Sequence, residues 1–486
     1  MPRDNGLLLA RRLGLGLRIG ENSPTDPRAW AMDQLRQVPP LGFPDRDGAD
    51  LLASLPEDAK PLEDFDQACR VWEVYKNANI KLQKESKKLS GREFDQRNWK
   101  EIVLPYMQIP RWRDCLAKTL TAVNGDAPVF ERFWMFWNNH FTVATPEAEI
   151  KLFYGPHIRN IRNRMTGKFA DLLFDAVANP GMLAYLNNDT SAGPNSRAAR
   201  REKHVDLNEN LARELLELHT MSPAAGYTQK DVIETALLLT GWQFYAGAVT
   251  NGGSPAKGQA YGTRYNPYRH EPGKRTILGK TYRPKGNGQN MLGELMRDLA
   301  VHPATARFIS WKLCRHFIAD EPPEESVKRV ETVWNETGGD LVAIHSAVVD
   351  ETIDKAAATT KMTTPENWLL QSFRTVRAPV PTAMPERGEA IHWLFKEIGQ
   401  AFDECPQPNG WPDTAADWLS RAMLDRRIRQ ADRIGATVDS LTADEIGDHA
   451  ERLVGSESRL PQTLRRAESR QMAVALLLTA PQFLKM

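Results

Sequence analysis

Apolar residues recur at spacings of three and four along most of the chain, which is the period of an amphipathic α-helix. Proline stands at the start of several of these segments, as Pro128 and Pro303 do, and favours a helix beginning there. Alternating runs of Val, Ile and Thr, which a sheet needs, are nearly absent. The pattern therefore predicts an all-α fold. The clearest helices are expected at 26–37, 65–86, 99–108, 128–141, 168–178, 229–242, 290–301, 303–320, 324–337, 365–377, 416–434 and 469–484.

One region breaks this pattern, from about residue 245 to 288. It is rich in Gly, Pro, Tyr and Lys, and within it KRTILGKTY resembles a short β-hairpin turned at Gly279. A long insert of this kind in a helical protein is usually a functional loop or a mobile one. We expect a long irregular loop here, with a short hairpin inside it.

The segment NENLARELLELH (208–219) predicts a helix with two different faces. On a wheel of 3.6 residues per turn, one stripe is apolar and faces the core, with Leu211, Leu215 and Leu218. A second stripe is polar and consists of Asn210, Arg213, Glu214 and Glu217. Two interpretations stay open. The polar stripe either faces solvent, where i,i+4 ion pairs stabilise a helix by about 0.2–0.5 kcal/mol, or forms an internal cluster of the kind found at many active sites.

The aromatic run RFWMFWNNHF (132–141) predicts a deeply buried helix that ends near His140. An imidazole held away from water tends to stay neutral, and a neutral imidazole is what a metal or a general base requires. The alternative is a core histidine satisfied by one backbone carbonyl. Weaker candidates are His270, in the insert, and His316, which follows Lys312 by four residues on a predicted helix.

Composition excludes several classes of function. The chain has 486 residues, with 63 Lys and Arg against 62 Asp and Glu, so no global field attracts nucleic acid or an anionic membrane. Length alone suggests about three average domains. The four cysteines are far apart and form no CxxC pair. No segment is apolar enough for a membrane span or a signal peptide, so we expect a cytoplasmic protein. HExxH, GxSxG, Walker and dinucleotide-binding motifs do not occur.

Several long motifs occur in order along the chain. They are ARRLGLG (10–16), WAMDQL (30–35), FWNNHF (136–141), NENLARELLELHTMSPAAGYTQKDVIETALLLTGW (208–242), HEPGKRTILGK (270–280), HPATARFISWKLCRHFIADEPP (302–323) and APQFL (480–484). Together they resemble the bacterial family called domain of unknown function 1800 (DUF1800), over nearly the whole chain.

The resemblance implies one large helical domain spanning 1–486 in place of three. We divide it into an N-terminal arm (1–60), a first helical half that contains the polar helix (61–244), the insert (245–288) and a second helical half (289–486). The family's motif residues fall on His140, Asn208, Glu209, Asn210, Arg213, Glu214, Glu217, Gly226, Tyr227, Thr228, Gly241, Trp242, His270, Lys274 and Gly279.

The resemblance also implies a partner. Members of the family are often exported and often encoded beside a second family, domain of unknown function 1501 (DUF1501), which resembles the sulfatase and alkaline-phosphatase type of fold. Export alongside such a DUF1501-type partner is therefore the alternative to a cytoplasmic location.

Two hypotheses about function follow. In the first, the protein is an enzyme, a metal-assisted hydrolase or an oxidoreductase. Its catalytic residues would be His140, Asn210, Arg213, Glu214 and Glu217. Residues at a substrate-binding lid would be Tyr227, Trp242, His270 and Lys274. A divalent metal would be held by His140, Glu214 and Glu217, since carboxylates and imidazole suit such ions.

In the second hypothesis, the protein is a non-catalytic helical partner or escort of the exported sulfatase-like protein, and the polar stripe fixes helix register. An open cavity lined by His140 and Glu214 would favour catalysis. A closed and fully paired network would favour an architectural role.

Overall fold

The computed structural model describes residues 3–45, 47–51, 64–86, 90–145, 148–202, 205–245, 262–381 and 389–486. Helices account for 62% of the chain and short antiparallel strands for 4%. The predicted fold class, mostly helical with a small β insert, is therefore confirmed.

The helices follow one another in chain order, and two segments, η4 and η5, are π-helical. The first half contains α1 (Asn5–Leu13), α2 (Pro27–Leu35), α3 (Phe65–Glu85), α4 (Gly91–Asn98), η4 (Trp99–Gln108), α5 (Ile109–Asn124), α6 (Pro128–His140), α7 (Ala148–Arg164), α8 (Phe169–Val177), α9 (Pro180–Tyr185), α10 (Asn210–Glu214), η5 (Leu215–Thr220) and α11 (Gln229–Leu239). The second half contains α12 (Asn290–Ala300), α13 (Pro303–Phe317), α14 (Glu324–Thr337), α15 (Leu341–Lys355), α16 (Pro365–Val376), α17 (Glu389–Glu397), α18 (Ala415–Trp418), α19 (Arg421–Thr437), α20 (Ala443–Val454), α21 (Leu460–Arg465), α22 (Arg470–Thr479) and α23 (Pro481–Leu484).

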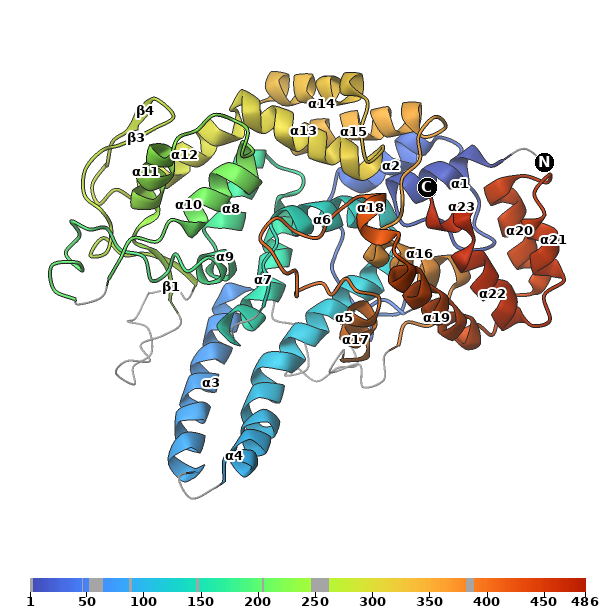
Figure 1. The fold of residues 1–486 in the computed structure, drawn as a ribbon, viewed down its shortest axis with the longest axis horizontal. Coiled ribbons are helices and arrows are strands. Elements are labelled where there is room, and N and C mark those ends of the chain that lie inside the picture. The colour runs from blue at the N-terminus through green and yellow to red at the C-terminus, as the bar shows by residue number, and fades with distance from the viewer. Residues whose placement is uncertain are drawn as a thin grey trace.

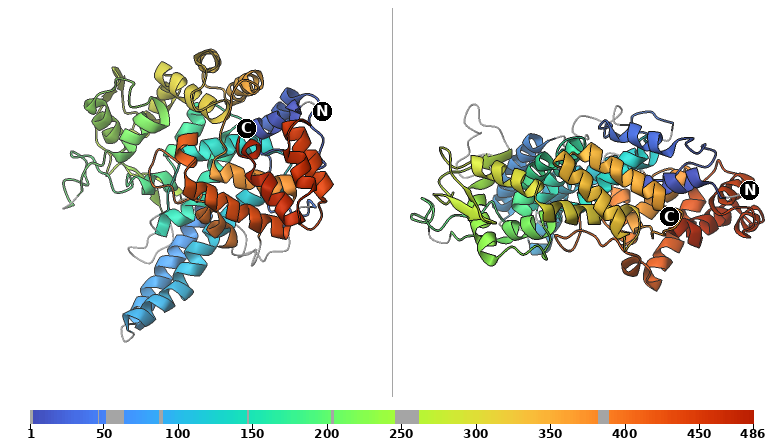
Figure 2. Two further views of the ribbon diagram at one scale, coloured as in Figure 1. Left: turned by 45° about the vertical axis from the view of Figure 1, so that its right-hand side comes forward. Right: turned by 90° about the horizontal axis from the view of Figure 1, so that it is seen from above.

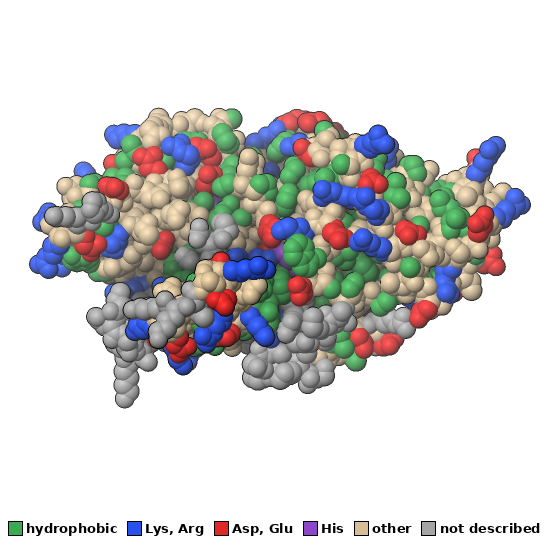
Figure 3. Space-filling view, turned by 60° about the horizontal axis from the view of Figure 1, so that its bottom comes forward, with side chains coloured by type: hydrophobic (Ala, Val, Ile, Leu, Met, Phe, Trp, Pro, Cys, Tyr) green, Lys and Arg blue, Asp and Glu red, His purple; other side chains and the backbone are tan. Residues whose placement is uncertain are grey.

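The helices form an elongated body from which one helical pair projects (Figures 1 and 2). The projecting pair is α3 packed against η4, and η4 continues α4 and leads into α5. A continuous core of buried apolar side chains extends from Leu7 in α1 to Phe483 in α23. On the face seen in Figure 3, basic and acidic side chains are interspersed, as the balanced composition predicts. Among the described residues, no helix combines the length and apolarity that crossing a membrane requires.

Local signals in the sequence explain where several helices begin and end. Thr228 and Asp231 form a capping box at the start of α11, in which each side chain accepts a hydrogen bond from the other residue's backbone. Pro303 occupies the first turn of α13, where its missing N–H is not needed. Gly338 ends α14 with φ at 61°, a left-handed conformation that favours glycine.

The β insert consists of two antiparallel pairs. Strand β1 (Trp242–Tyr245) pairs with β2 (Gly262–Tyr265), and β3 (Arg275–Ile277) pairs with β4 (Lys280–Tyr282). Leu278 and Gly279 connect β3 to β4 with φ at 50° and 78°, which is the pattern of a tight hairpin turn. The hairpin predicted at Gly279 is present. Residues 246–261 of the predicted insert, and residues 52–60 of the predicted N-terminal arm, lie outside the described residues.

The polar helix differs from its prediction in one respect. It is α-helical only over α10 and becomes π-helical in η5. A π-turn is wider than 3.6 residues, so the wheel used for the prediction loses register after Glu214. Leu211 and Leu215 are buried as expected, but Leu218 is half-buried, and Leu216 and His219 face the core instead.

Buried arginines tie the two ends of the chain together. The Arg11 guanidinium donates to the carbonyl oxygens of Gln482 (2.9 Å) and Lys485 (3.2 Å). Arg12 donates to the carbonyls of Thr359 (2.8 Å), Met486 (2.5 Å) and Ile318.

A third buried arginine links α6 to both of these regions. Arg132 donates to the carbonyls of Arg11 (3.2 Å) and His316 (3.3 Å). Burial lowers the pKa of Arg12 to about 10 and that of Arg132 to about 9. The ends of the chain and the C-terminal end of α13 are therefore joined through guanidinium groups bound to backbone carbonyls.

We expect Arg12→Met to lower the free energy of unfolding by about 3 kcal/mol or more. The substitution leaves buried carbonyl oxygens unsatisfied, at about 1–3 kcal/mol for each. Urea unfolding followed by circular dichroism measures the change. The control is Arg36→Met, which removes an exposed side chain in a weak pair with Asp33 and should change stability by less than about 0.5 kcal/mol. Equal stabilities of the two variants would contradict the prediction.

Candidate functional site

A cavity of about 400 Å³ lies between α6, α13 and the segment 406–417. Helix α6 contributes Phe136, Asn139 and His140. Helix α13 contributes Trp311, Lys312, Arg315 and His316. The segment, which we call the 406–417 loop, contributes Pro406, Gln407, Asn409, Gly410, Trp411, Pro412, Asp413, Thr414 and Asp417.

The helical period of α13 explains why its polar residues reach one cavity. Lys312 and His316 are four residues apart and lie one above the other on the same face. On a neighbouring face, Leu313 and Phe317 are fully buried in the core. The core contacts of α13 therefore point Lys312 and His316 toward the 406–417 loop.

His140 lies at the end of α6, where only 2% of its surface is exposed. Its Nδ1 is 3.0 Å from the Lys312 ammonium, and its Nε2 is 3.2 Å from the carbonyl oxygen of His219. Since an ammonium only donates and a carbonyl only accepts, the proton of the neutral ring is on Nε2. Burial first, and Lys312 second, hold the pKa of His140 well below its usual value. His140 therefore has the backbone carbonyl partner expected of a core histidine, and it has a second partner, Lys312, at the cavity.

The Lys312 ammonium is itself in an unusual environment. Burial lowers the pKa of Lys312 to about 8, although Asp413 acts in the opposite direction. Near neutral pH the amine is therefore charged but is a much stronger acid than an ordinary lysine.

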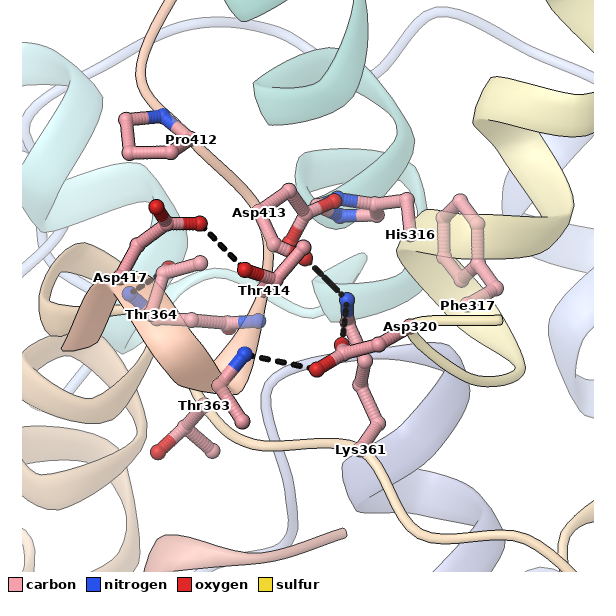
Figure 4. A network of polar contacts seen from close by, with 12 residues as sticks. His316, Phe317, Asp320, Lys361, Thr363, Thr364, Pro412, Asp413, Thr414 and Asp417 are labelled. Carbon is pink, nitrogen blue, oxygen red and sulfur yellow. Dashed lines mark hydrogen bonds and ion pairs between the residues drawn. The ribbon is translucent and has the colours of Figure 1, made fainter. Parts of the chain in front are cut away.

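His316 and Asp413 form a hydrogen-bonded pair at the cavity wall (Figure 4). The His316 Nδ1 donates to Asp413 Oδ2 at 2.7 Å. His316 Nε2 is buried and has no hydrogen-bond partner among the described residues. Because Nδ1 carries the proton, Nε2 presents a free lone pair. A histidine oriented by a carboxylate in this way has the arrangement of a general base.

Asp413 is held by the His316 ring and by two cations. Burial by itself raises the pKa of a carboxyl group, but His316, Lys361 and Arg132 together hold the pKa of Asp413 well below its usual range. The Lys361 ammonium is 3.4 Å from Asp413 Oδ1 and donates to the backbone carbonyl of the same residue. Lys361 also donates to Asp320 at 2.8 Å, as Figure 4 shows. Asp413 is therefore ionised and fixed in position.

Asn139 fixes the other end of the loop against α6. Its side-chain amide donates to the Trp411 carbonyl (2.9 Å), and its oxygen accepts from the Trp411 backbone N–H (2.7 Å). Gly410 has φ at 81°, and a Cβ atom there would lie 2.3 Å from the Asn139 carbonyl oxygen. Glycine is thus required at this position, both for its conformation and for the close approach.

The polar stripe of α10 and η5 lies outside this cavity lining. Arg213 forms ion pairs with Glu217 (3.2 Å) and Glu209 (3.4 Å), and its side chain remains 39% exposed. Asn210 is exposed. Glu214 is half-buried, and burial together with Glu217 raises its pKa. Of the five predicted catalytic residues, His140 lines the cavity, while the other four form a partly exposed group of their own.

The predicted lid residues are also distributed elsewhere. Trp242 and His270 are buried, and the His270 Nδ1 lies 2.8 Å from the Thr240 carbonyl. Tyr227 is half-buried and hydrogen-bonds to Glu217, and Lys274 is exposed. All four lie outside the cavity lining.

A different set of residues has the spacing of metal ligands. Ligand atoms of Cys115, His392 and Asp403 lie within 4.8 Å of one another. Within the described residues, this is the one group of three or more potential ligands with such spacing. The Arg111 guanidinium already occupies the space near them, since its Nε is 2.8 Å from Asp403 and its Nη2 is 2.9 Å from His392 Nε2. A cation at this position would compete with a guanidinium that already neutralises Asp403.

The predicted metal set of His140, Glu214 and Glu217 is not a grouping with that spacing in the described residues. The lone pair of the His140 ring, on Nδ1, accepts a hydrogen bond from Lys312.

Sequence reasoning missed the 406–417 loop. The run CPQPNGWPDTA (405–415) is rich in Pro, Gly and Asn and contains a single acidic residue, Asp413. Two features of the sequence pointed to the site: the four-residue spacing of Lys312 and His316, and this loop. Nothing in the sequence links the two, because Asp413 and His316 are separated by 97 positions.

The fold and cavity define a mostly helical protein with a histidine–aspartate pair at an open pocket. The chain matches the model of the family described as "Protein of unknown function (DUF1800)" over residues 8–485. It therefore belongs to the DUF1800 family, as the resemblance predicted. No curated protein and no solved structure matches the chain.

Lys312 should react with acylating reagents at an unusually low pH. With its pKa lowered to about 8, the amine loses its proton more than two pH units below an ordinary lysine at about 10.4. Trace acetylation with acetic anhydride, quantified by mass spectrometry across pH 6–11, should show a midpoint near 8 for Lys312. The exposed Lys274 in the same digest calibrates the reagent. A midpoint above 10 for Lys312 would rule out the buried environment described here.

Asp413→Asn should destabilise the protein by about 3–5 kcal/mol at pH 7, because it leaves buried cations without their carboxylate. The pKa of Asp413 is lowered in the folded state, so its contribution is fully present above about pH 4, the ordinary value. The contribution decreases as pH falls further. Urea unfolding at pH 7 and at pH 3 should therefore show a smaller difference between wild type and variant at pH 3. A difference that grows on acidification would contradict this assignment.

Proposed function

We propose that the protein is a hydrolytic enzyme whose active site is the cavity between α6, α13 and the 406–417 loop. The observation that carries the proposal is the unpartnered Nε2 of His316 on a ring whose other nitrogen donates to Asp413 at 2.7 Å. Buried polar atoms are normally paired, and an unpaired one on a residue that lines a cavity favours a ligand or water partner.

The roles follow from the chemistry of each group. His316 accepts a proton from a water molecule, and Asp413 orients the ring and stabilises the imidazolium that forms. The water oxygen then bonds to the electrophilic centre of an ester-type substrate. As the bond to the leaving-group oxygen breaks, Lys312 donates a proton to that oxygen, for which a pKa of about 8 is suited.

His140 acts through Lys312 as a positioning residue. Its Nδ1 accepts from the Lys312 ammonium at 3.0 Å and holds it on the cavity side of α13. Its own neutral state is favoured by burial, which lowers its pKa. The histidine singled out from the sequence thus keeps a place in the proposed site, with a lysine as its partner.

His316→Gln tests the proposal. Wild-type protein should hydrolyse at least one of 4-nitrophenyl acetate, 4-nitrophenyl phosphate and 4-nitrophenyl sulfate above the buffer rate. The variant should lower kcat by about 10²–10⁴-fold, the usual contribution of a general base. Release of nitrophenolate, followed by absorbance, measures both.

The matched control is His302→Ser, at the other end of the same helix. His302 caps α13 by accepting from the Ala304 N–H, and serine keeps an acceptor at that position. This variant should retain the wild-type rate. Undiminished turnover in His316→Gln, or no turnover of any of the three esters by wild type, would refute the proposal.

The partner role that the family resemblance implies stays a prediction. Copurification with a DUF1501-type protein from the native host tests it, and cell fractionation of the same host tests export. Neither result depends on the cavity variants, because the hydrolytic proposal rests on His316 and Asp413 alone.

A further inference from the structure

Two cations that line the cavity form no ion pair with a carboxylate of the described residues. The one described hydrogen-bond partner of the Lys312 ammonium is the neutral ring of His140. The Arg315 guanidinium lies over the face of Trp311, 4.7 Å from the ring centroid, and its Nε is buried without a hydrogen bond among the described residues. Neither side chain forms an ion pair with a described carboxylate, and both are half-buried.

The two carboxylates that line the cavity, Asp413 and Asp417, have other partners. Asp413 binds His316 and Lys361, and Asp417 accepts from the Thr414 hydroxyl. Among the described residues, neither carboxylate forms an ion pair with Lys312 or Arg315, and Asp413 acts on Lys312 only as a longer-range charge.

A second cavity shows what a balanced arrangement looks like in this chain. There, Arg111 lies 2.8 Å from Asp403 and 3.6 Å from Glu404, and Lys396 lies 2.8 Å from Glu404. Half-buried cations are normally paired in this way, because an uncompensated charge away from water is costly. The difference at Lys312 and Arg315 points to a counter-charge supplied by a ligand.

The rest of the lining indicates what else the ligand contains. Phe136, Trp311 and Trp411 form apolar parts of the wall, and the Nε2 of His316, another lining residue, is buried without a hydrogen-bond partner among the described residues. The volume of about 400 Å³ falls within the range of about 300–1,000 Å³ found for small-molecule sites.

We infer that the cavity binds a small organic oxyanion, with its charged group between Lys312 and Arg315 and its carbon skeleton against Phe136, Trp311 and Trp411. Arginine and lysine are the usual ligands of carboxylate, phosphate and sulfate groups. The inference rests on the proposed function, because it takes the same cavity as the active site. It adds the class of substrate that this site binds.

Binding of four small probes tests the inference. Phenyl phosphate, phenyl sulfate and benzoate share one ring and differ in the oxyanion, and benzyl alcohol is the neutral control. Tryptophan fluorescence and isothermal titration calorimetry at constant ionic strength give each Kd. At least one oxyanion should bind about tenfold more tightly than benzyl alcohol, and the order among the three identifies the preferred group. Equal affinity for the neutral probe would overturn the inference.

Variants locate the binding site. Arg315→Gln and Lys312→Met should each weaken the preferred probe about tenfold or more, which is the loss expected for one charge-assisted hydrogen bond. Arg307→Gln is the matched control, because Arg307 lies on the same helix but pairs with Glu324 at 2.6 Å. If Lys312→Met fails to fold, Arg315→Gln decides the matter, since it leaves no carboxylate unpaired. Wild-type affinity in Arg315→Gln would exclude this site.

His316→Gln separates the inference from the proposed function. This variant should bind the preferred probe within about threefold of wild type while its esterase activity is lost. Oxyanion binding without any hydrolysis by wild type would leave the inference standing and remove the proposed function. In the opposite case, wild type and Arg315→Gln hydrolyse 4-nitrophenyl acetate at the same rate and no oxyanion probe binds. That result would refute the inference and leave the proposed function standing.

Discussion

The carboxylate of Asp413 is the one anion on which the middle of this molecule depends. It meets His316 and Lys361 directly and lies in the field of Arg132. Arg132 in turn holds the backbone of α13 at His316 and of α1 at Arg11. A carboxylate largely withdrawn from water loses stability when any of these partners is removed. The 406–417 loop, α13 and the N-terminal helix are therefore positioned together, and the cavity between them is a consequence.

The same shortage of buried anions gives the cavity its chemistry. The chain as a whole is balanced, with 63 basic and 62 acidic side chains, yet its interior is rich in cations that rely on backbone carbonyls, as Arg11 and Arg12 do. The Lys312 ammonium instead donates to the neutral ring of His140. Burial lowers the pKa of this amine to about 8. An acid of that strength beside a histidine–aspartate pair is what acid–base catalysis near neutral pH requires.

Parts of the site were accessible to sequence reasoning and parts were not. His140 stood out because the ten-residue run 132–141 around it contains five aromatic residues, and the structure buries it. Its partner was misplaced: the Glu214 and Glu217 side chains looked suitable on a wheel of 3.6 residues per turn, but the helix widens into η5 directly after Glu214. The true neighbour of His140 is Lys312, which is 172 positions away. A single sequence does not indicate that two residues so far apart along the chain are in contact.

The sequence by itself determined the helical fold class, the hairpin at Gly279 and the burial of the aromatic helix, because these depend on periodicity, turn residues and apolarity within one segment. It also carried the DUF1800 motifs from end to end. Only the tertiary structure decided which polar groups meet, because side chains of α6, α13 and the 406–417 loop come together through packing of distant segments. Hydrogen bonds require their two atoms to lie within about 3.2 Å of each other, so the partners of His140, Lys312 and His316 are set by that packing and not by their order along the chain.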